Sequence, residues 1–172
     1  IGTVLSNIKF FTMPNGGTIT LLSMLPFVLV SFRHGAKWGV MTAFVNSLIQ
    51  LVQGLGNLAY CQTLTAQVGC VLLDYLLAFT VLGFACLIAK PFRSRTVGVG
   101  VSAFVVCLLR FLCSFLSGVL VWGNLNEGLS AWTYSLVYNA SYMLPETLLT
   151  VVAAVLLIKV APQIFDRQYT KA

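Results

Sequence analysis

The sequence predicts an all-α membrane protein: one domain over residues 1–172, built as a bundle of six transmembrane helices with both termini in the cytoplasm. Hydrophobic residues make up 59% of the 172 positions and charged residues only 8%, whereas soluble domains carry about 25% charged residues. The mean hydropathy is +0.94. Basic residues fall in short segments between apolar runs and form no patch interleaved with aromatic residues, so the net charge of +6 is expected to set membrane topology and not to bind nucleic acid.

Five apolar runs approach or exceed the roughly 20 residues that a membrane-spanning helix needs. They cover residues 19–32, 36–53, 61–89, 96–122 and 131–160. The first is short and contains Pro26, so we expect a kinked or tilted span there. The segment before Met13 is too short to cross a bilayer, and we interpret it as the outer end of a first helix that is truncated at Ile1.

Positive charges orient the predicted spans. Lysine and arginine follow the second, fourth and sixth spans, whereas the alternate loops "TMPNGGTIT", "GLGNLAYCQT" and "GNLNEGLS" contain neither. The positive-inside rule therefore places these three loops outside the cell. The cytoplasmic basic residues are then Arg33, Lys37, Lys90, Arg93, Arg95, Lys159, Arg167 and Lys171.

Three charged residues remain inside apolar runs: Asp74, Arg110 and Glu146. A charge within the membrane is costly, so it faces protein or a water-filled cavity and marks a functional site. We expect Arg110 and Glu146 to neutralise each other as a structural ion pair. Asp74 is then left without a cation, which favours a ligand with a hydrogen-bond donor or a positive charge.

Polar and small residues recur at helical spacing on one face of each of the last two spans. We expect these faces to line a pocket open to the outside, with Asp74 opposite. Two other interpretations stay open: small residues permit close helix packing, and aromatic residues near the outer ends anchor the helices at the membrane interface. The two faces carry Arg110, Ser114, Ser117, Gly118 and Trp122, and Ser135, Tyr138, Asn139, Tyr142 and Glu146.

The sequence does not predict an enzyme, a metal site or a cofactor. The single histidine, His34, lies in a cytoplasmic turn, so a serine nucleophile in the membrane has no base. The Asp, Glu, His and Cys residues do not cluster at the spacing of metal ligands.

Four blocks of sequence together resemble the thiamine-specific S-components (ThiT family) of energy-coupling factor (ECF) vitamin transporters. They read "MPNGGTITLLSMLPFVLVSFRHGAKWGV", "LLDYLLAFTVLGFACL", "RFLCSFLSGVLVWG" and "YSLVYNASYMLPE". The resemblance runs from about Met13 to Leu157. It implies a subunit of a bacterial plasma membrane that captures thiamine from outside. Its partners would be a transmembrane coupling subunit and two cytoplasmic ATPase subunits.

The resemblance also implies roles for individual residues. The family acid that contacts the aminopyrimidine ring falls on Asp74, followed by Tyr75, and the tryptophan that stacks on the ligand falls on Trp122. The tyrosine and asparagine that hydrogen-bond the pyrimidine fall on Tyr134 and Asn139. With the loop that closes over the ligand and the polar faces, the expected ligand-binding set is Asp74, Tyr75, Ser114, Trp122, Tyr134, Tyr138, Asn139, Gly17 and Thr18.

One position departs from the family pattern. Better-known members place a histidine four residues after the basic position that matches Arg110, where it stacks on the thiazolium side; this sequence has Ser114. A related ring, such as hydroxymethylpyrimidine or pyridoxine, is therefore an alternative ligand. A membrane assembly protein without a transport role is the more distant alternative.

Overall fold

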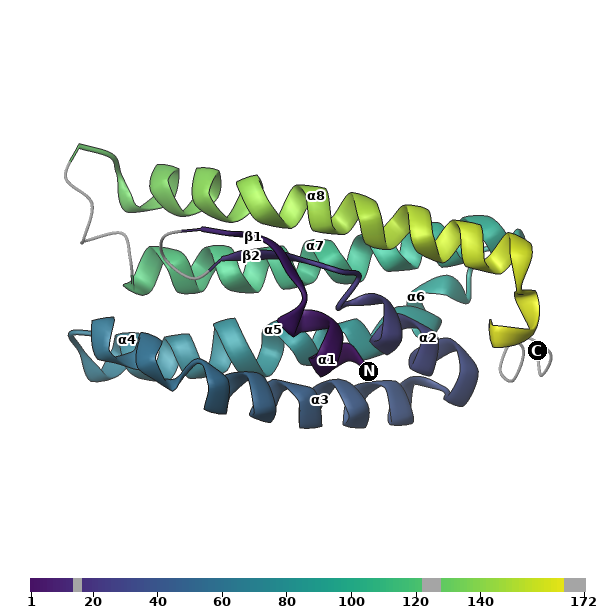
Figure 1. Ribbon diagram of the computed structural model, residues 1–172, viewed down its shortest axis with the longest axis horizontal. Coiled ribbons are helices and arrows are strands. Elements are labelled where there is room, and N and C mark those ends of the chain that lie inside the picture. Colours follow the sequence, from purple (N-terminus) through teal and green to yellow (C-terminus); the bar gives the residue numbers. More distant parts are fainter. Residues whose placement is uncertain (14–16, 122–127, 166–172) are drawn as a thin grey trace.

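The computed structural model describes residues 1–13, 17–121 and 128–165. In these residues three helical segments are long and apolar enough to cross a membrane: Leu64–Ala89, α7 (Arg95–Val121) and α8 (Ala131–Val160). They run side by side along the long axis of the molecule together with α3 (Ala36–Gln53), as Figure 1 shows. The multi-pass helical architecture is thus as predicted, whereas the count of six spans is not confirmed.

The span Leu64–Ala89 changes its helical geometry along its length. It begins at Thr63, whose hydroxyl accepts a hydrogen bond of 3.1 Å from the backbone amide of Ala66. A π-helical stretch carries Asp74 and Tyr75 in its middle, and such stretches occur frequently at functional sites. The successive parts are α4 (Leu64–Gly69), η2 (Cys70–Leu77), α5 (Ala78–Thr80), η3 (Val81–Phe84) and α6 (Ala85–Ala89).

Glycine allows α3 to lie directly against η3. A Cβ atom on Gly83 would lie 2.3 Å from the backbone nitrogen of Val40, and one on Gly39 would lie 2.7 Å from the carbonyl oxygen of Gly83. Backbone atoms cannot move aside for such a methyl group. This contact therefore fixes α3 against the central span, as small residues do between membrane helices.

The N-terminal region differs from the prediction. A short helix α1 (Gly2–Asn7) is followed by two antiparallel strands, β1 (Lys9–Thr12) and β2 (Thr18–Thr20), where we expected a truncated helix and the start of a span. The strands pair Phe11 with Ile19, and β2 lies beside α8 (Figure 1).

The predicted span at 19–32 is therefore a strand, a bend and the 10-residue helix α2 (Leu25–His34). The β-branched residues Thr18 to Thr20 favour extended backbone. Leu22 takes a positive φ of 56°, and Pro26 lies in the first turn of α2. Proline is tolerated there because the amide it lacks would have no helical partner, so the new helix begins beside it.

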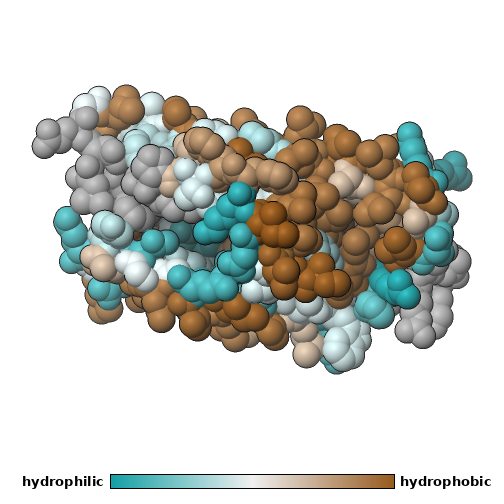
Figure 2. Space-filling view, viewed as in Figure 1, coloured by the Kyte–Doolittle hydropathy of each residue, from teal (hydrophilic) through white to brown (hydrophobic). Residues whose placement is uncertain are grey.

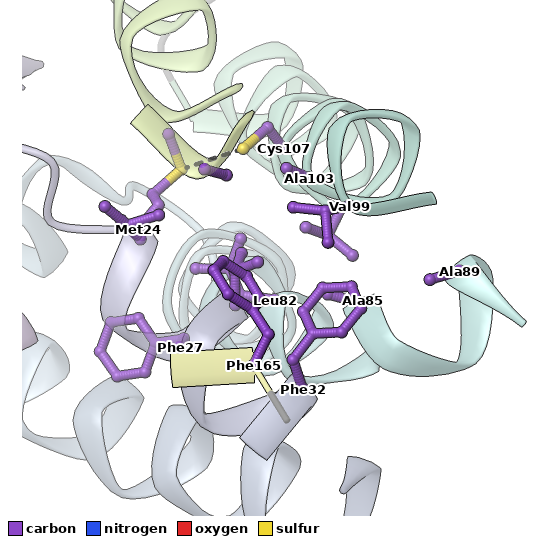
Figure 3. Close-up of a cluster of buried hydrophobic side chains, with 14 of the residues drawn as sticks. Met24, Phe27, Phe32, Leu82, Ala85, Ala89, Val99, Ala103, Cys107 and Phe165 are labelled. Carbon is purple, nitrogen blue, oxygen red and sulfur yellow. Dashed lines mark hydrogen bonds between the residues drawn. The ribbon is translucent and has the colours of Figure 1, made fainter. Parts of the chain in front are cut away.

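A buried apolar cluster fills the end of the bundle where α2, α6 and the final turn η5 (Pro162–Phe165) meet. Figure 3 shows Leu82, Phe32 and Phe165 within this cluster, and the Phe32 and Phe165 rings pack edge to face with their centroids 5.6 Å apart. The thiol of Cys107 donates to the sulfur of Met24 at 3.7 Å. This half of the bundle is held by packing.

The outer surface of the bundle is apolar. On α7, leucines recur at every fourth position and each is about two-fifths exposed, at Leu108, Leu112, Leu116 and Leu120. Such a stripe suits contact with lipid. In Figure 2 brown apolar residues cover most of the visible face, and hydrophilic residues gather at its ends and near its middle.

Candidate ligand-binding site

The half of the bundle away from the apolar cluster contains a cavity of about 350 Å³. Small-molecule sites commonly have volumes of about 300–1,000 Å³. The cavity is lined by the N-terminal hairpin, the end of α3, the turn η1 (Leu55–Tyr60), η2, α7 and α8. On α8 the lining extends from Tyr134 to Glu146, or about 18 Å at the helical rise per residue.

Three tyrosines form a ladder along the α8 wall. Tyr134, Tyr138 and Tyr142 are spaced four residues apart, and neighbouring rings lie 5.8 Å apart in both pairs, the first pair stacked and the second edge to face. The backbone amide of Gly17 donates to the Tyr138 hydroxyl at 2.9 Å. A Cβ atom on Gly17 would lie 2.7 Å from the Tyr142 ring. The hairpin thus lies directly on the ladder, and glycine is needed for that approach.

Asn139 is held within α8. Its amide nitrogen donates to the backbone oxygen of Ser135 at 2.9 Å, and its carbonyl oxygen accepts from the Tyr142 hydroxyl at 2.7 Å. The hydroxyl of Ser135 in turn donates to the backbone oxygen of Phe115 on α7 at 2.6 Å. Asn139 lines the cavity, and its carbonyl oxygen retains a second lone pair for another donor.

Asp74 enters the cavity from the π-helical stretch. The hydroxyl of Ser114 on α7 donates to its Oδ1 at 2.9 Å. Ser114, one of the polar residues predicted to bind ligand, therefore contacts Asp74. Its hydrogen bond holds the Asp74 carboxylate at a defined position between η2 and α7.

Tyr75 braces the turn above Asp74. Its hydroxyl accepts from the side-chain amide of Asn57 at 3.0 Å and donates to the backbone oxygen of Gly54 at 3.1 Å. A Cβ atom on Gly54 would overlap the tyrosine oxygen, at 2.1 Å. Because Tyr75 is only 7% exposed, its main contribution in this structure is to position η1 at the cavity.

The predicted ion pair between Arg110 and Glu146 is not formed. Glu146, 1% exposed, instead accepts hydrogen bonds on Oε1 from the hydroxyls of Thr20 and Ser23, the latter at 2.9 Å. The Nε and Nη1 atoms of Arg110 are buried and have no hydrogen-bond partner. The prediction is wrong for a physical reason. The segment that begins with β2 brings two hydroxyl donors to the Glu146 carboxylate, and in the predicted helix over 19–32 these hydroxyls would have pointed elsewhere.

Eight of the nine residues predicted to bind ligand line this one cavity: Asp74, Tyr75, Ser114, Tyr134, Tyr138, Asn139, Gly17 and Thr18. Trp122, the ninth, lies outside the described residues. The polar faces of α7 and α8 meet across the cavity as predicted, except that Ser117 is not part of the lining. The 1–13, 17–121 and 128–165 ranges hold no group of three or more His, Cys, Asp or Glu residues that could bind a metal ion.

The part of the cavity lining that comes from the hairpin and from the end of α3 was not predicted from the sequence. A signal for the hairpin was present, because an Asn-Gly pair between β-branched or aromatic residues favours a hairpin turn. Polar residues near the end of α3 were a second signal. The missed residues include Lys9, Thr20, Ser23, Gln50, Gln53 and Asn57.

A bundle of apolar helices that encloses a polar cavity of this size defines a membrane protein that binds a small solute. Comparison with known proteins identifies the family. The family model described as "Thiamine transporter protein (Thia_YuaJ)" matches residues 1–166, and the chain belongs to this family. Two relatives, both named "Thiamine transporter ThiT", support the assignment.

The relative from Bacillus subtilis (strain 168) is 34% identical over 165 residues, covering 90% of this chain and 82% of that protein. The relative from Lacticaseibacillus paracasei is 28% identical over 153 residues, covering 83% and 74%. The solved structure of ThiT from Listeria monocytogenes shares the fold, with a TM-score of 0.75 and 22% identity over 95% of this chain and 90% of that one.

The family and the apolar spanning helices together make the chain a multi-pass protein of the bacterial plasma membrane. It belongs with transporters and not with enzymes, as the sequence analysis expected.

Proposed function

We propose that this chain is the substrate-binding subunit, the S-component, of an ECF-type importer, and that it captures thiamine from outside the cell in the cavity described above. The observation that carries the proposal is Asp74, a carboxylate that lines the same cavity of about 350 Å³ as the tyrosine ladder, inside an apolar bundle. A few convergent polar groups in a largely preformed cavity are typical of small-molecule sites.

The chemistry of thiamine fits this lining. Its thiazolium ring is a permanent cation, which is attracted to the faces of aromatic rings such as those of Tyr134 and Tyr138. Its aminopyrimidine offers an amino donor that a carboxylate accepts. We assign that contact to Asp74, with Ser114 fixing the carboxylate.

The other members of the predicted site receive supporting roles. Asn139 would form a hydrogen bond with the pyrimidine and give up one of its present hydrogen bonds to its α8 neighbours. Trp122 would stack on the ligand. Gly17 and Thr18 would bring the hairpin over the bound vitamin, and Tyr75 would hold the η1 side of the cavity. The whole chain would act as one binding domain over residues 1–172, with both termini in the cytoplasm.

Release into the cell requires an energy source, which we assign to partner subunits. A transmembrane coupling subunit and two cytoplasmic ATPases would drive uptake, as in ECF transporters. If so, vesicles that contain this chain and the three partners take up thiamine only when ATP is present on the side of the membrane where the ATPases lie. Vesicles that contain this chain alone do not accumulate thiamine. Accumulation by the chain alone would contradict this assignment.

A related ring remains the second candidate ligand, and Ser114 is the observation that favours it. Its hydroxyl is engaged with Asp74 at 2.9 Å and presents no ring to stack on a thiazolium. Hydroxymethylpyrimidine or pyridoxine would need only the Asp74 end of the cavity.

Calorimetric titration of the purified chain with thiamine, hydroxymethylpyrimidine and pyridoxine tests the proposal. We expect thiamine to bind most tightly, and Tyr138→Leu to weaken it by about tenfold through the lost aromatic contact. Tyr60→Leu is the matched control, because Tyr60 is 54% exposed and outside the cavity lining. Tightest binding of a ring without the thiazolium would make the second candidate the ligand. Binding of none of the three would reject the proposal and leave the assembly role.

A further inference from the structure

Arg110 lies on the wall of the cavity with unused hydrogen-bonding capacity. It projects from α7 one helical turn from Ser114, and both residues line the cavity. Its Nε and Nη1 atoms are buried without a hydrogen-bond partner. Its guanidinium carbon lies over the Phe79 ring, 4.4 Å from the ring centroid.

The carboxylates of the cavity are engaged elsewhere. Asp74 accepts from Ser114, and Glu146 accepts from Thr20 and Ser23. Within the residues that the structure describes, neither forms an ion pair with Arg110. Neutral oxygen atoms do not take the place of a carboxylate either, since no side-chain or backbone oxygen accepts a hydrogen bond from the buried Nε and Nη1 atoms of Arg110.

A structural role alone does not account for this arrangement. Arginine is always charged in proteins, and a buried donor without an acceptor costs about 1–3 kcal/mol, more when the group is charged. Buried polar groups are almost always satisfied, so an exception requires an explanation. The guanidinium is also held in place by its contact with the Phe79 ring. This attraction between a cation and an aromatic ring uses none of the guanidinium N–H donors as conventional hydrogen bonds, so they stay available to an acceptor.

We propose that Arg110 contacts the ligand directly and donates from its guanidinium N–H groups to a neutral hydrogen-bond acceptor on the bound vitamin. This rests on the proposed function. Thiamine has two kinds of neutral acceptor, the pyrimidine ring nitrogens and the oxygen of its hydroxyethyl tail. Two cations, Lys9 and Arg110, and two carboxylates, Asp74 and Glu146, line the cavity, so the carboxylates offset the repulsion between Arg110 and a cationic ligand.

The test is a thermodynamic cycle between protein and ligand. The purified wild-type chain, Arg110→Met and Arg110→Lys are titrated with thiamine, with an analogue whose hydroxyethyl group is replaced by ethyl, and with analogues in which one pyrimidine nitrogen is replaced by C–H. Arg95→Met is the matched control: it makes the same change at the first residue of α7, 15 residues and about 22 Å away along the helix, and outside the cavity lining.

We expect Arg110→Met to weaken thiamine binding about ten- to a hundredfold, as for the loss of a hydrogen bond from a charged donor, and Arg95→Met to change it less than twofold. The loss should shrink to about twofold or less with the one analogue that lacks the contacted acceptor, because non-additivity reports a direct contact. That analogue identifies the acceptor as a ring nitrogen or the tail oxygen. Arg110→Lys keeps the positive charge but loses the planar set of guanidinium donors, so its affinity for thiamine should lie between those of the wild-type chain and Arg110→Met.

Unchanged affinity in Arg110→Met overturns the inference. So does an equal loss with every analogue, since Arg110 would then act on the fold and not on the ligand. Should Arg110→Met fail to yield folded protein, Arg110→Lys decides the same cycle. A wild-type chain that does not bind thiamine rejects the proposed function itself, and this outcome is read before any variant.

Discussion

The two halves of the bundle are built on different principles although the same helices run through both. On α7, Val99 and Ala103 are fully buried in the apolar cluster, whereas Arg110 and Ser114 line the cavity further along the same helix. On α8 the order is reversed, because the helix runs the opposite way: the tyrosine ladder comes first and the buried Ala154 and Ile158 follow. Each helix is thus packed at one end and open to a polar cavity at the other.

The difference shows where stability and function are located. The apolar half contains close-packed side chains and the glycine contact between α3 and η3. The polar half contains hydrogen bonds that hold individual groups in place, and Arg110 with unsatisfied donors. Local arrangements that do not favour stability are typical of functional sites. Substitutions in the two halves should therefore separate the effects on unfolding from the effects on binding.

The largest effect on stability is expected in the apolar half. Leu82→Ala would leave a void at a fully buried position and lower the free energy of unfolding by about 3 kcal/mol, with thiamine affinity nearly unchanged. Leu112→Ala is the matched control, because this leucine is 43% exposed on the lipid-facing stripe. Thermal unfolding in detergent compares the stabilities of the two variants, and titration with thiamine compares their affinities. Equal melting temperatures for the two variants would show that the apolar cluster does not hold the bundle.

A smaller effect, on both properties, is expected where the hairpin is attached to α8. Glu146→Ala removes the carboxylate that accepts from Thr20 and Ser23 and should destabilise the protein by about 2 kcal/mol, since the two buried hydroxyls keep only the hydrogen bond of 2.7 Å between them. Thiamine affinity should fall with it as the hairpin loosens over the tyrosine ladder. Glu146→Gln keeps an oxygen acceptor and should recover most of the loss in melting temperature and affinity. If the two variants behave alike, the hydrogen bonds to Thr20 and Ser23 do not hold the hairpin.

The smallest effect on stability is expected at Ser114. Ser114→Ala removes the hydrogen bond to Asp74 and should weaken thiamine binding about three- to tenfold, the usual range for one hydrogen bond. The melting temperature of the free protein should hardly change. Ser117→Ala, one turn along α7 and outside the cavity lining, is the control. Equal affinities for the two variants would show that Asp74 does not depend on Ser114.

The helical core and most of the candidate site follow from the sequence, because both depend on local periodicity. Polar residues at every third or fourth position placed Ser114 on one face of α7 and Tyr138 on one face of α8, and both line the cavity. Asp74 stood out because a charge in an apolar run requires a specific environment.

The hairpin and the partner of Glu146 could not be derived in this way. Apolar content does not distinguish a short strand from the end of a helix, so residues 19–32 were assigned to a span. The pairing of charges depends on tertiary contacts. Because the hydroxyls of Thr20 and Ser23 donate to Glu146, this carboxylate does not need Arg110 as a partner, and the sequence alone does not reveal that contact. The π-helical geometry around Asp74 was likewise not predicted, because the apolar periodicity of this span does not distinguish a π-helical stretch from an α-helix.

The most direct test of the central claim, that the polar half is a thiamine site supported by the apolar half, is the melting temperature of the wild-type chain and Asp74→Asn with and without thiamine. A ligand that binds only the folded state stabilises it in proportion to the logarithm of its concentration. The account predicts that thiamine raises the wild-type melting temperature progressively, and that Asp74→Asn melts no lower than wild type without ligand and gains little from thiamine. An Asp74→Asn variant that is destabilised on its own, yet gains as much from thiamine as wild type, would contradict it.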